Sequence, residues 1–221
     1  MNKVALIIFQ KNAQLGKVKT RLAASIGNEK ALEIYQWLTA YTHEQVRGIK
    51  VDKFLFFSDF IPEIPVGEYT NYQFRVQSGE NLGDRMRNAF SQLFESGYKS
   101  VVIIGTDCPE MTKNDIEKAF LNLGQVDLVI GPARDGGYYL LGMSSFFPEL
   151  FNDISWSTSK VLESTLDRAD KLNLEYEFLK VLSDIDTLSD LEQFNIQHKI
   201  THEMPMRRLL TQGDDYFGHS I

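Results

Sequence analysis

The stretch that most constrains the fold of this chain is residues 101–109, Val-Val-Ile-Ile-Gly-Thr-Asp-Cys-Pro. Four β-branched apolar residues in succession predict a strand buried on both faces, as in the parallel sheets of α/β proteins. Pro109 lacks a backbone N–H and disfavours continuation of the strand. Asp107 is therefore expected at the carboxyl end of a buried strand, where α/β sheets bind their ligands. A carboxylate there suits a divalent cation, which in turn can hold phosphate.

Apolar runs of strand length alternate with helical patterns along the chain. We expect strands at 4–9, 53–58, 73–77, 101–104, 126–130, 138–143 and 176–179, and helices that begin near 28, 82, 114, 158 and 188. This alternation predicts βαβ units and a mostly parallel central sheet flanked by helices. Asn28 is the expected N-cap of the first helix. No linker divides the chain, so we expect one domain over residues 1–203, followed by a tail, 204–221, that is disordered or packs on a partner.

The composition of the 221 residues argues against several classes of protein. A net charge of −7 disfavours a nucleic-acid binder, which usually has a basic face. Cys108 is the single cysteine; we expect it to pack in the core, because no base that would activate it as a nucleophile is apparent. No disulfide framework, secretory signal or membrane span is recognisable. A cytoplasmic protein is the default expectation.

A basic loop, residues 11–21, follows the first predicted strand and precedes a helix, the usual position for phosphate binding in α/β folds. Gly16 permits close approach of the backbone to a ligand. Lys11, Lys19 and Arg21 supply positive charge, and the Arg21 guanidinium matches phosphate oxygens. The loop is neither a Walker A sequence nor a Gly-x-Gly-x-x-Gly fingerprint. A solvated cationic loop is the alternative.

A second glycine-rich turn, residues 77–86, leads into a predicted helix. It contains Gly79, and Arg85 lies in the first turn of the helix. A cation at a helix N-terminus opposes the macrodipole. Arg85 is therefore expected to have an anionic partner, which is either a phosphate or the carboxylate of Asp84 or Glu80.

Asp135 stands before Gly136 and Gly137 on a tight connection between two predicted strands. The two glycines permit positive φ and close approach of a ligand. Asp-Gly is also a strong hairpin signal, and the two interpretations are compatible. Trp156 lies in a run of hydroxyl residues, 155–159, of which helix capping explains one. Trp156 is either a core residue or a platform for a sugar.

Asp184 and Asp186 flank one apolar residue after the last predicted strand. On an extended segment both carboxylates point to the same side, which suits a further metal ligand. Capping of the following helix is the alternative role of Asp186. His198 and His202 are four residues apart, but no third ligand is near in the sequence, so zinc is not expected.

Taken together, the motifs resemble a known family. They are, in order, Gly-x-Val-Lys-Thr-Arg-Leu, Gly-x-x-Leu-Gly-x-Arg-Met, Gly-Thr-Asp-Cys-Pro, Gly-Pro-Ala-x-Asp-Gly-Gly-Tyr, Trp-Ser-Thr and Asp-x-Asp-Thr. This set is similar to the bacterial DUF2064 family, also called the radical-SAM/selenodomain-associated transferase 1 group. The resemblance implies the GT-A fold of nucleotide-diphospho-sugar transferases, and many members are labelled arsenosugar-biosynthesis glycosyltransferases. Asn12 and Ala13 depart from it, because similar proteins carry a proline there, which leaves the rigidity of the loop open.

The resemblance also implies site roles. Gly16, Lys19 and Arg21 would lie nearest the nucleotide phosphates. Asp107 stands where such folds place the metal-binding carboxylate of an Asp-x-Asp-type motif, of which only one acid is present here. We expect Mg²⁺ or Mn²⁺ on Asp107, with Asp184 and Asp186 as further ligands.

These observations favour a metal-dependent glycosyltransferase that uses a nucleotide-diphospho-sugar and a small-molecule acceptor. The expected nucleotide-binding residues are Lys11, Gly16, Lys19, Arg21, Gly79 and Arg85. Asp135 would bind or deprotonate the acceptor hydroxyl, with Gly136, Gly137 and Trp156 on the acceptor side. A nucleotidyltransferase of the molybdopterin-cofactor or phospholactate guanylyltransferase type is the alternative, and a non-catalytic nucleotide-binding protein is a third reading. A homodimer stays open.

Overall fold

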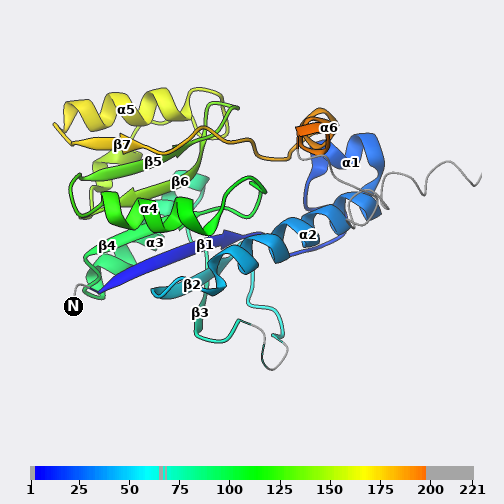
Figure 1. Ribbon diagram of the computed structural model, residues 1–221, viewed down its shortest axis with the longest axis horizontal. Coiled ribbons are helices and arrows are strands. Elements are labelled where there is room, and N and C mark those ends of the chain that lie inside the picture. Colours follow the sequence, from blue (N-terminus) through cyan, green and yellow to red (C-terminus); the bar gives the residue numbers. More distant parts are fainter. Residues whose placement is uncertain (1–2, 65–66, 68, 198–221) are drawn as a thin grey trace, which may run out of the picture.

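In the computed structural model, one seven-stranded sheet forms the centre of the protein, in the order β3-β2-β1-β4-β6-β5-β7 (Figure 1). The structure describes residues 3–64, 67 and 69–197. The strands are β1 (Val4–Gln10), β2 (Asp52–Phe57), β3 (Tyr72–Val76), β4 (Ser100–Ile104), β5 (Leu128–Pro132), β6 (Tyr138–Met143) and β7 (Tyr176–Phe178). Neighbouring strands are parallel except at β6, which is antiparallel to β4 and β5. The prediction of a mostly parallel sheet is confirmed.

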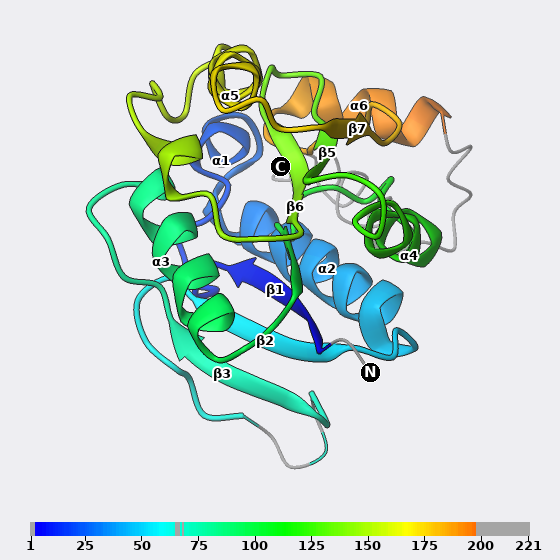
Figure 2. The ribbon, with the colours of Figure 1, turned by 90° about the vertical axis from the view of Figure 1, so that its left-hand side faces the viewer.

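Helices cover both faces of the sheet (Figure 2). They are α1 (Thr20–Ile26), α2 (Asn28–Arg47), α3 (Leu82–Glu95), α4 (Lys113–Asn122), the 3₁₀ helix η1 (Pro148–Phe151), α5 (Val161–Lys171) and α6 (Leu188–Gln197). One core cluster joins α3, η1 and α5 to one face, and a second joins α2 and α4 to the other. Along β4, Val101 and Ile103 belong to the first cluster, whereas Val102 and Ile104 belong to the second. Burial on both faces explains the unbroken apolar run.

The order of the strands creates a crevice at their carboxyl ends. β1 lies between β2 and β4 and is parallel to both. The chain therefore leaves β1 towards one side of the sheet and later fills the other side. In open α/β sheets, ligands bind outside the carboxyl ends at such a reversal of strand order.

Two helical segments and one cap differ from the sequence prediction. The segments α1 and η1 were not predicted, because seven and four residues are too short to show a helical period. Asn28 is the first residue of α2 and not its N-cap, so that prediction was wrong. Gly27, at φ 85°, is the only residue between α1 and α2 and caps both, which leaves Asn28 no room outside the helix.

The connection from β5 to β6 is the predicted hairpin. Gly136 N donates to Ala133 O at 3.1 Å and Ala133 N donates to Gly137 O at 3.0 Å, which closes the turn.

Cys108 is 3% exposed within the second core cluster, as expected of a packing residue. No helix in the described part of the chain has the length and apolarity that crossing a membrane requires. His198, His202 and the tail over 204–221 lie outside the described residues.

Candidate functional site

A pocket of about 610 Å³ opens at the carboxyl ends of the strands. Residues that follow β1 and β4, the β5–β6 turn, and the segment between β7 and α6 all contribute to its wall. Nine of the residues singled out from the sequence line it: Lys11, Lys19, Arg21, Asp107, Asp135, Gly137, Trp156, Asp184 and Asp186. These nine residues therefore share one cavity, although Lys11 and Asp186 are 175 residues apart in the sequence.

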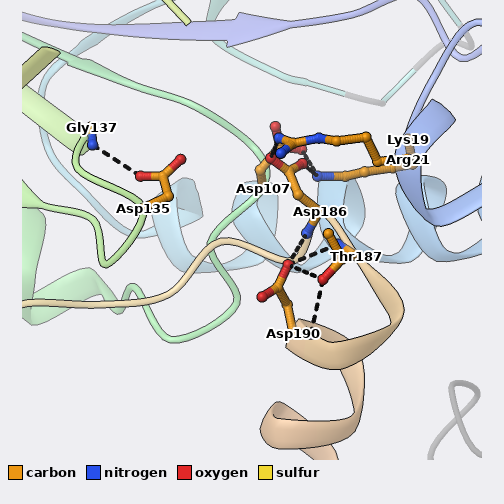
Figure 3. A network of polar contacts seen from close by, with 8 residues as sticks. All are labelled: Lys19, Arg21, Asp107, Asp135, Gly137, Asp186, Thr187 and Asp190. Carbon is orange, nitrogen blue, oxygen red and sulfur yellow. Dashed lines mark hydrogen bonds and ion pairs between the residues drawn. The ribbon is translucent and has the colours of Figure 1, made fainter. Parts of the chain in front are cut away.

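The charged centre of the pocket is a lysine held between two carboxylates (Figure 3). Lys19 Nζ lies 2.7 Å from Asp107 Oδ1 and 3.1 Å from Asp186 Oδ1. The Lys19 side chain is only 3% exposed. Arg21 NH2 donates to the other oxygen of Asp186, Oδ2. The loop after β1 is thus joined to the segments that follow β4 and β7.

Burial and the neighbouring charges shift the pKa values of three side chains of the pocket. Burial on its own lowers the pKa of Lys19, but the charges of Asp107 and Asp186 outweigh it, so the pKa of Lys19 is raised. Burial favours the neutral form of Asp186, but Lys19 and Arg21 hold its pKa below the usual range. The pKa of Asp184 is raised to about 7, first by burial and then by the charge of Asp107. Among the described residues, Asp184 forms no ion pair, in contrast to Asp107 and Asp186.

Asp186 is fixed by the start of α6 and not by its own capping of that helix. Asp190 Oδ2 accepts from Asp186 N at 3.1 Å and from Thr187 N and Thr187 Oγ1 at 2.8 Å each. Asp190 and Thr187 thus satisfy the first turn of the helix, and the Asp186 carboxylate is left to face Lys19 and Arg21. The alternative considered from the sequence, in which Asp186 caps α6, is therefore wrong.

The carboxylates suit a divalent cation only in part. Within the described residues, no group of three or more His, Cys, Asp or Glu side chains is gathered as a metal site. However, Asp107 and Asp186 each aim one oxygen at a single point, which the Lys19 ammonium fills. Mg²⁺ is typically held by one or two carboxylates together with water and substrate phosphates. Two converging carboxylates fit such an ion if phosphate completes its ligands.

Asp135 lies apart from this centre, on the β5–β6 turn (Figure 3). Its Oδ1 accepts from Gly137 N at 2.9 Å, and the side chain is exposed. Gly136 adopts φ 90°, and a Cβ there would lie 2.0 Å from Ser159 O. Gly136 is therefore required by the packing of the turn on the 155–159 segment, and it does not line the pocket.

Trp156 lines the pocket from the side of the core cluster that contains residues of α3, η1 and α5. Its indole packs on Gly83 in the first turn of α3, where a Cβ would lie 2.1 Å from Trp156 Nε1. The indole also stacks with the ring of Phe151, at a centroid distance of 6.3 Å. Trp156 thus packs against the core, as one of the two roles considered from the sequence requires, and it also lines the pocket. Its role as a platform for a sugar stays a prediction.

Two groups of lining residues differ in chemistry and in the segments that carry them, and we call them the cationic end and the aromatic end. The cationic end comprises Lys11, Lys19 and Arg21 with the carboxylates of Asp107, Asp184 and Asp186. The aromatic end comprises Leu82, Met86, Trp156 and the hydroxyl residues Ser157, Thr158 and Ser159. Asp135 also lines the wall. Among the described residues, all lysine and arginine side chains that line the pocket belong to the cationic end.

Gly16, Gly79 and Arg85 do not line the pocket. Gly79 is at φ 139°, and a Cβ there would lie 2.6 Å from Asp84 Cβ, so close packing requires glycine. Arg85 Nε donates to Gly79 O at 3.3 Å. The expected alternative, an ion pair of Arg85 with Asp84 or Glu80, is absent from the described contacts, and Asp84 instead pairs with Arg87 at 3.1 Å.

Several residues of the site were not singled out from the sequence. Gln10 and Gln77 line the pocket from the ends of β1 and β3, and Tyr35 lines it from α2. Gln10 Oε1 lies 2.8 Å from Nε2 of the buried His43. Amides and a lone histidine carry little local signal, because their role depends on contacts distant in the sequence.

Asn12 stands in the loop after β1, whose rigidity the missing proline left open, and its side chain holds that loop in place. Its Oδ1 accepts from Ser58 Oγ at 3.1 Å and from Asp59 N at 3.0 Å, and its Nδ2 donates to Phe60 O at 2.9 Å. Asn12 is 5% exposed. The side chain ties the loop after β1 to the loop after β2, which supplies order that a proline would otherwise provide.

The chain has the nucleotide-diphospho-sugar transferase fold, and its pocket lies at the carboxyl ends of the strands, where open α/β sheets bind ligands. Its fold matches the crystal structure of a "putative nucleotide-diphospho-sugar transferase" from Desulfovibrio desulfuricans G20, with a TM-score of 0.86 and 31% identity over 97% of this chain and 96% of that one. The family model described as "Uncharacterized protein conserved in bacteria (DUF2064)" matches residues 54–158. The protein belongs to the DUF2064 family.

Two curated relatives are similar over part of the chain. A 2-phospho-L-lactate guanylyltransferase from Methanocaldococcus vulcanius is 28% identical over 142 residues, 61% of this chain and 63% of the relative. The protein of the same name from Methanocaldococcus jannaschii is 33% identical over 121 residues, 53% of this chain and 52% of the relative. The chain thus spans less than two thirds of these relatives.

Proposed function

We propose that the protein is a metal-dependent glycosyltransferase that takes a nucleotide-diphospho-sugar and transfers the sugar to an uncharged hydroxylated acceptor. The observation that carries this proposal is the division of the pocket. All its cations lie at the cationic end, whereas the aromatic end offers a tryptophan face and hydroxyl groups. This distribution suits a donor whose diphosphate binds at one end and an acceptor without phosphate at the other.

The cationic end supplies the groups that a diphosphate needs. Lys11, Lys19 and Arg21 come from one short stretch of chain and reach the same pocket wall. Charge-assisted hydrogen bonds from lysine and arginine to phosphate are among the stronger polar contacts in proteins. Asp107 and Asp186 would hold Mg²⁺ or Mn²⁺, which neutralises the leaving diphosphate when bound.

The aromatic end suits a hydroxylated ring. Trp156 is held by Gly83 and Phe151, so its orientation is fixed before a ligand arrives. Ser157, Thr158 and Ser159 provide donors and acceptors on the same wall. Binding sites with a rigid apolar surface and a few polar groups orient small ligands well.

In the proposed reaction, the acceptor oxygen attacks the anomeric carbon of the donor sugar. A carbon–oxygen bond to the acceptor forms, the bond from the anomeric carbon to the phosphate oxygen breaks, and the nucleoside diphosphate leaves with the electron pair. Asp135 takes the proton of the acceptor hydroxyl. Its carboxylate is exposed in the pocket wall and keeps Oδ2 free of the turn, because Oδ1 accepts from Gly137 N.

The second candidate is a nucleotidyltransferase that joins a nucleoside triphosphate to a phosphorylated substrate and releases pyrophosphate. The names of the two curated relatives favour it. The same cationic end would bind the triphosphate. Its phosphorylated substrate would place the attacking phosphate beside the α-phosphate of the triphosphate, so the cationic end would have to serve both phosphate groups.

Product analysis separates the two candidates. The protein is incubated with Mn²⁺ and either a panel of nucleotide sugars and neutral sugar acceptors, or nucleoside triphosphates and sugar phosphates. Release of a nucleoside diphosphate with a new glycoside supports the glycosyltransferase, and release of pyrophosphate supports the nucleotidyltransferase. Tight nucleotide binding without turnover across both panels would favour the non-catalytic reading. Asp107→Asn is the inactive control.

A further inference from the structure

The ammonium group of Lys19 stands where a metal ion shared by Asp107 and Asp186 would have to stand. Its Nζ is 2.7 Å and 3.1 Å from one oxygen of each carboxylate. A divalent ion that contacts the same two oxygens would nearly coincide with Nζ, because metal–oxygen distances are about 2.0–2.6 Å. The ion and the ammonium group therefore exclude each other sterically.

Charge adds to this exclusion. The Lys19 side chain is 3% exposed, so water screens its charge weakly. Two cations at such a distance repel strongly in a partly buried site. A free metal ion would have to displace Lys19 from both of the carboxylates that it contacts.

Phosphate changes this balance. Lys19 is the N-cap of α1 and adopts the left-handed conformation, φ 48° and ψ 43°, so its long stem leaves the backbone at the pocket wall. A diphosphate bound at the cationic end gives the ammonium group a new anionic partner within the same pocket. Meanwhile Arg21 contacts Oδ2 of Asp186, and not Oδ1, so Asp186 stays oriented when Lys19 leaves.

We infer that Lys19 is the resident counter-ion of Asp107 and Asp186, and that the site takes the metal–diphosphate complex and not the free metal. On binding, the Lys19 ammonium would move from the carboxylates to the phosphate, and Asp107 and Asp186 would then be the residues that hold the metal. No covalent bond changes in this exchange. The inference rests on the proposed function, because it assigns the form in which the donor arrives.

The test measures Mn²⁺ binding without any nucleotide, from the electron paramagnetic resonance signal of free Mn²⁺. We expect Lys19→Met to bind Mn²⁺ at least about tenfold more tightly than the wild type, since a buried competing charge is removed. Lys11→Met is the matched control: it removes a lysine from the same pocket that has no described ion pair with either carboxylate. A gain of equal size in Lys11→Met, or no gain in Lys19→Met, would overturn the inference.

Inorganic pyrophosphate serves as the diphosphate probe, because it carries two phosphate groups but no nucleoside. In the wild type, pyrophosphate should raise Mn²⁺ affinity at least about tenfold, and in Lys19→Met much less. If the wild type shows this gain but Lys19→Met binds free Mn²⁺ no better than the wild type, the inference fails and the proposed metal dependence stands. If neither protein binds Mn²⁺ with or without pyrophosphate, the proposed function itself fails.

A measurement on the wild type covers the case in which Lys19→Met does not fold. The side-chain ¹⁵Nζ resonance of Lys19 is followed by NMR during titration. Mg²⁺ alone should leave it unchanged, whereas Mg²⁺ with pyrophosphate should shift it. A shift produced by Mg²⁺ alone contradicts the inference.

Discussion

The two ends of the pocket are built in different ways. The cationic end is held by ion pairs between segments distant in the sequence, with Lys19 between Asp107 and Asp186. The aromatic end is held by packing, with Trp156 against Gly83 and Phe151. Ion pairs can exchange partners when a ligand brings its own charge, whereas a close-packed indole has one position. The contrast predicts an adaptable donor site beside a rigid acceptor site.

The largest expected effect separates chemistry from binding. Asp135→Asn should lower kcat by about 10²–10⁴, the usual contribution of a general base, and leave donor affinity unchanged. Asparagine keeps an Oδ1 that accepts from Gly137 N, so the turn survives. Steady-state kinetics and calorimetry with the donor measure the two effects. The exposed Asp153→Asn, at the ion pair with Arg168, is the control. Normal turnover in Asp135→Asn would reduce Asp135 to a turn residue.

The next effect tests the cationic end alone. Asp107→Asn should weaken Mn²⁺-dependent nucleotide binding by about 100-fold or more, because metal sites already lose up to about that factor when a supporting contact is removed. Asparagine is nearly isosteric, so the fold and the aromatic end should persist. Calorimetry with and without Mn²⁺ measures the loss, and Glu44→Gln, in an exposed pair on α2, is the control. Unchanged Mn²⁺ dependence would remove Asp107 from the metal site.

A third change tests the rigidity of the aromatic end. Gly83→Ala should lower the free energy of unfolding by about 1–3 kcal/mol, since the added Cβ meets the Trp156 indole. The sign is informative, because alanine otherwise favours a helix over glycine. Gly48→Ala is the control, as its Cβ would meet Lys113 Nζ at an ordinary 3.4 Å. Denaturation and tryptophan fluorescence measure the effect. Undiminished stability would mean that Trp156 is free to move.

The smallest effect concerns His43, which contacts Gln10 beside the cationic end. Burial lowers the pKa of His43 from 6.5 to about 4. Between these values the unfolded chain binds the proton and the folded chain does not, so stability falls as pH falls. From pH 7 to pH 5.5 this loss should be about 1 kcal/mol. His43→Gln should remove that part of the slope in denaturant titrations at each pH. An identical slope in both proteins would show that folding does not lower the pKa of His43.

Strand ends were the most predictable part of the site. The apolar run before Asp107 and the Asp-Gly turn after β5 are local patterns, and both lie where the sequence indicated. Parallel pairing then brings the strand ends to one edge, so Asp107, Asp135 and Asp184 share one pocket. Local patterns are enough to predict the location of a site residue when the parallel sheet determines where its strand ends.

Contacts between distant segments were not predictable. Lys19 was expected near phosphate, but nothing local shows that Asp186, 167 residues further on, holds it. Gly83 was part of a motif, yet only the packing of Trp156 explains why glycine stands there. Arg85 was expected at the site from an argument about its helix alone, and it instead contacts Gly79 O outside the pocket. Periodicity and propensity describe a segment and not its partner.

The link from Asp186 to Lys19 and Arg21 has a consequence for synthesis. Lys19 and Arg21 leave the ribosome well before the carboxylate that pairs with them, because Asp186 belongs to the segment just before α6. A nascent chain that ends before residue 186 can pair β1 with β2 and β4, yet Lys19 then has only Asp107 as a partner. The ion pairs of the cationic end are thus completed only after residue 186 has been synthesised, later than the pairing of β1 with β2 and β4.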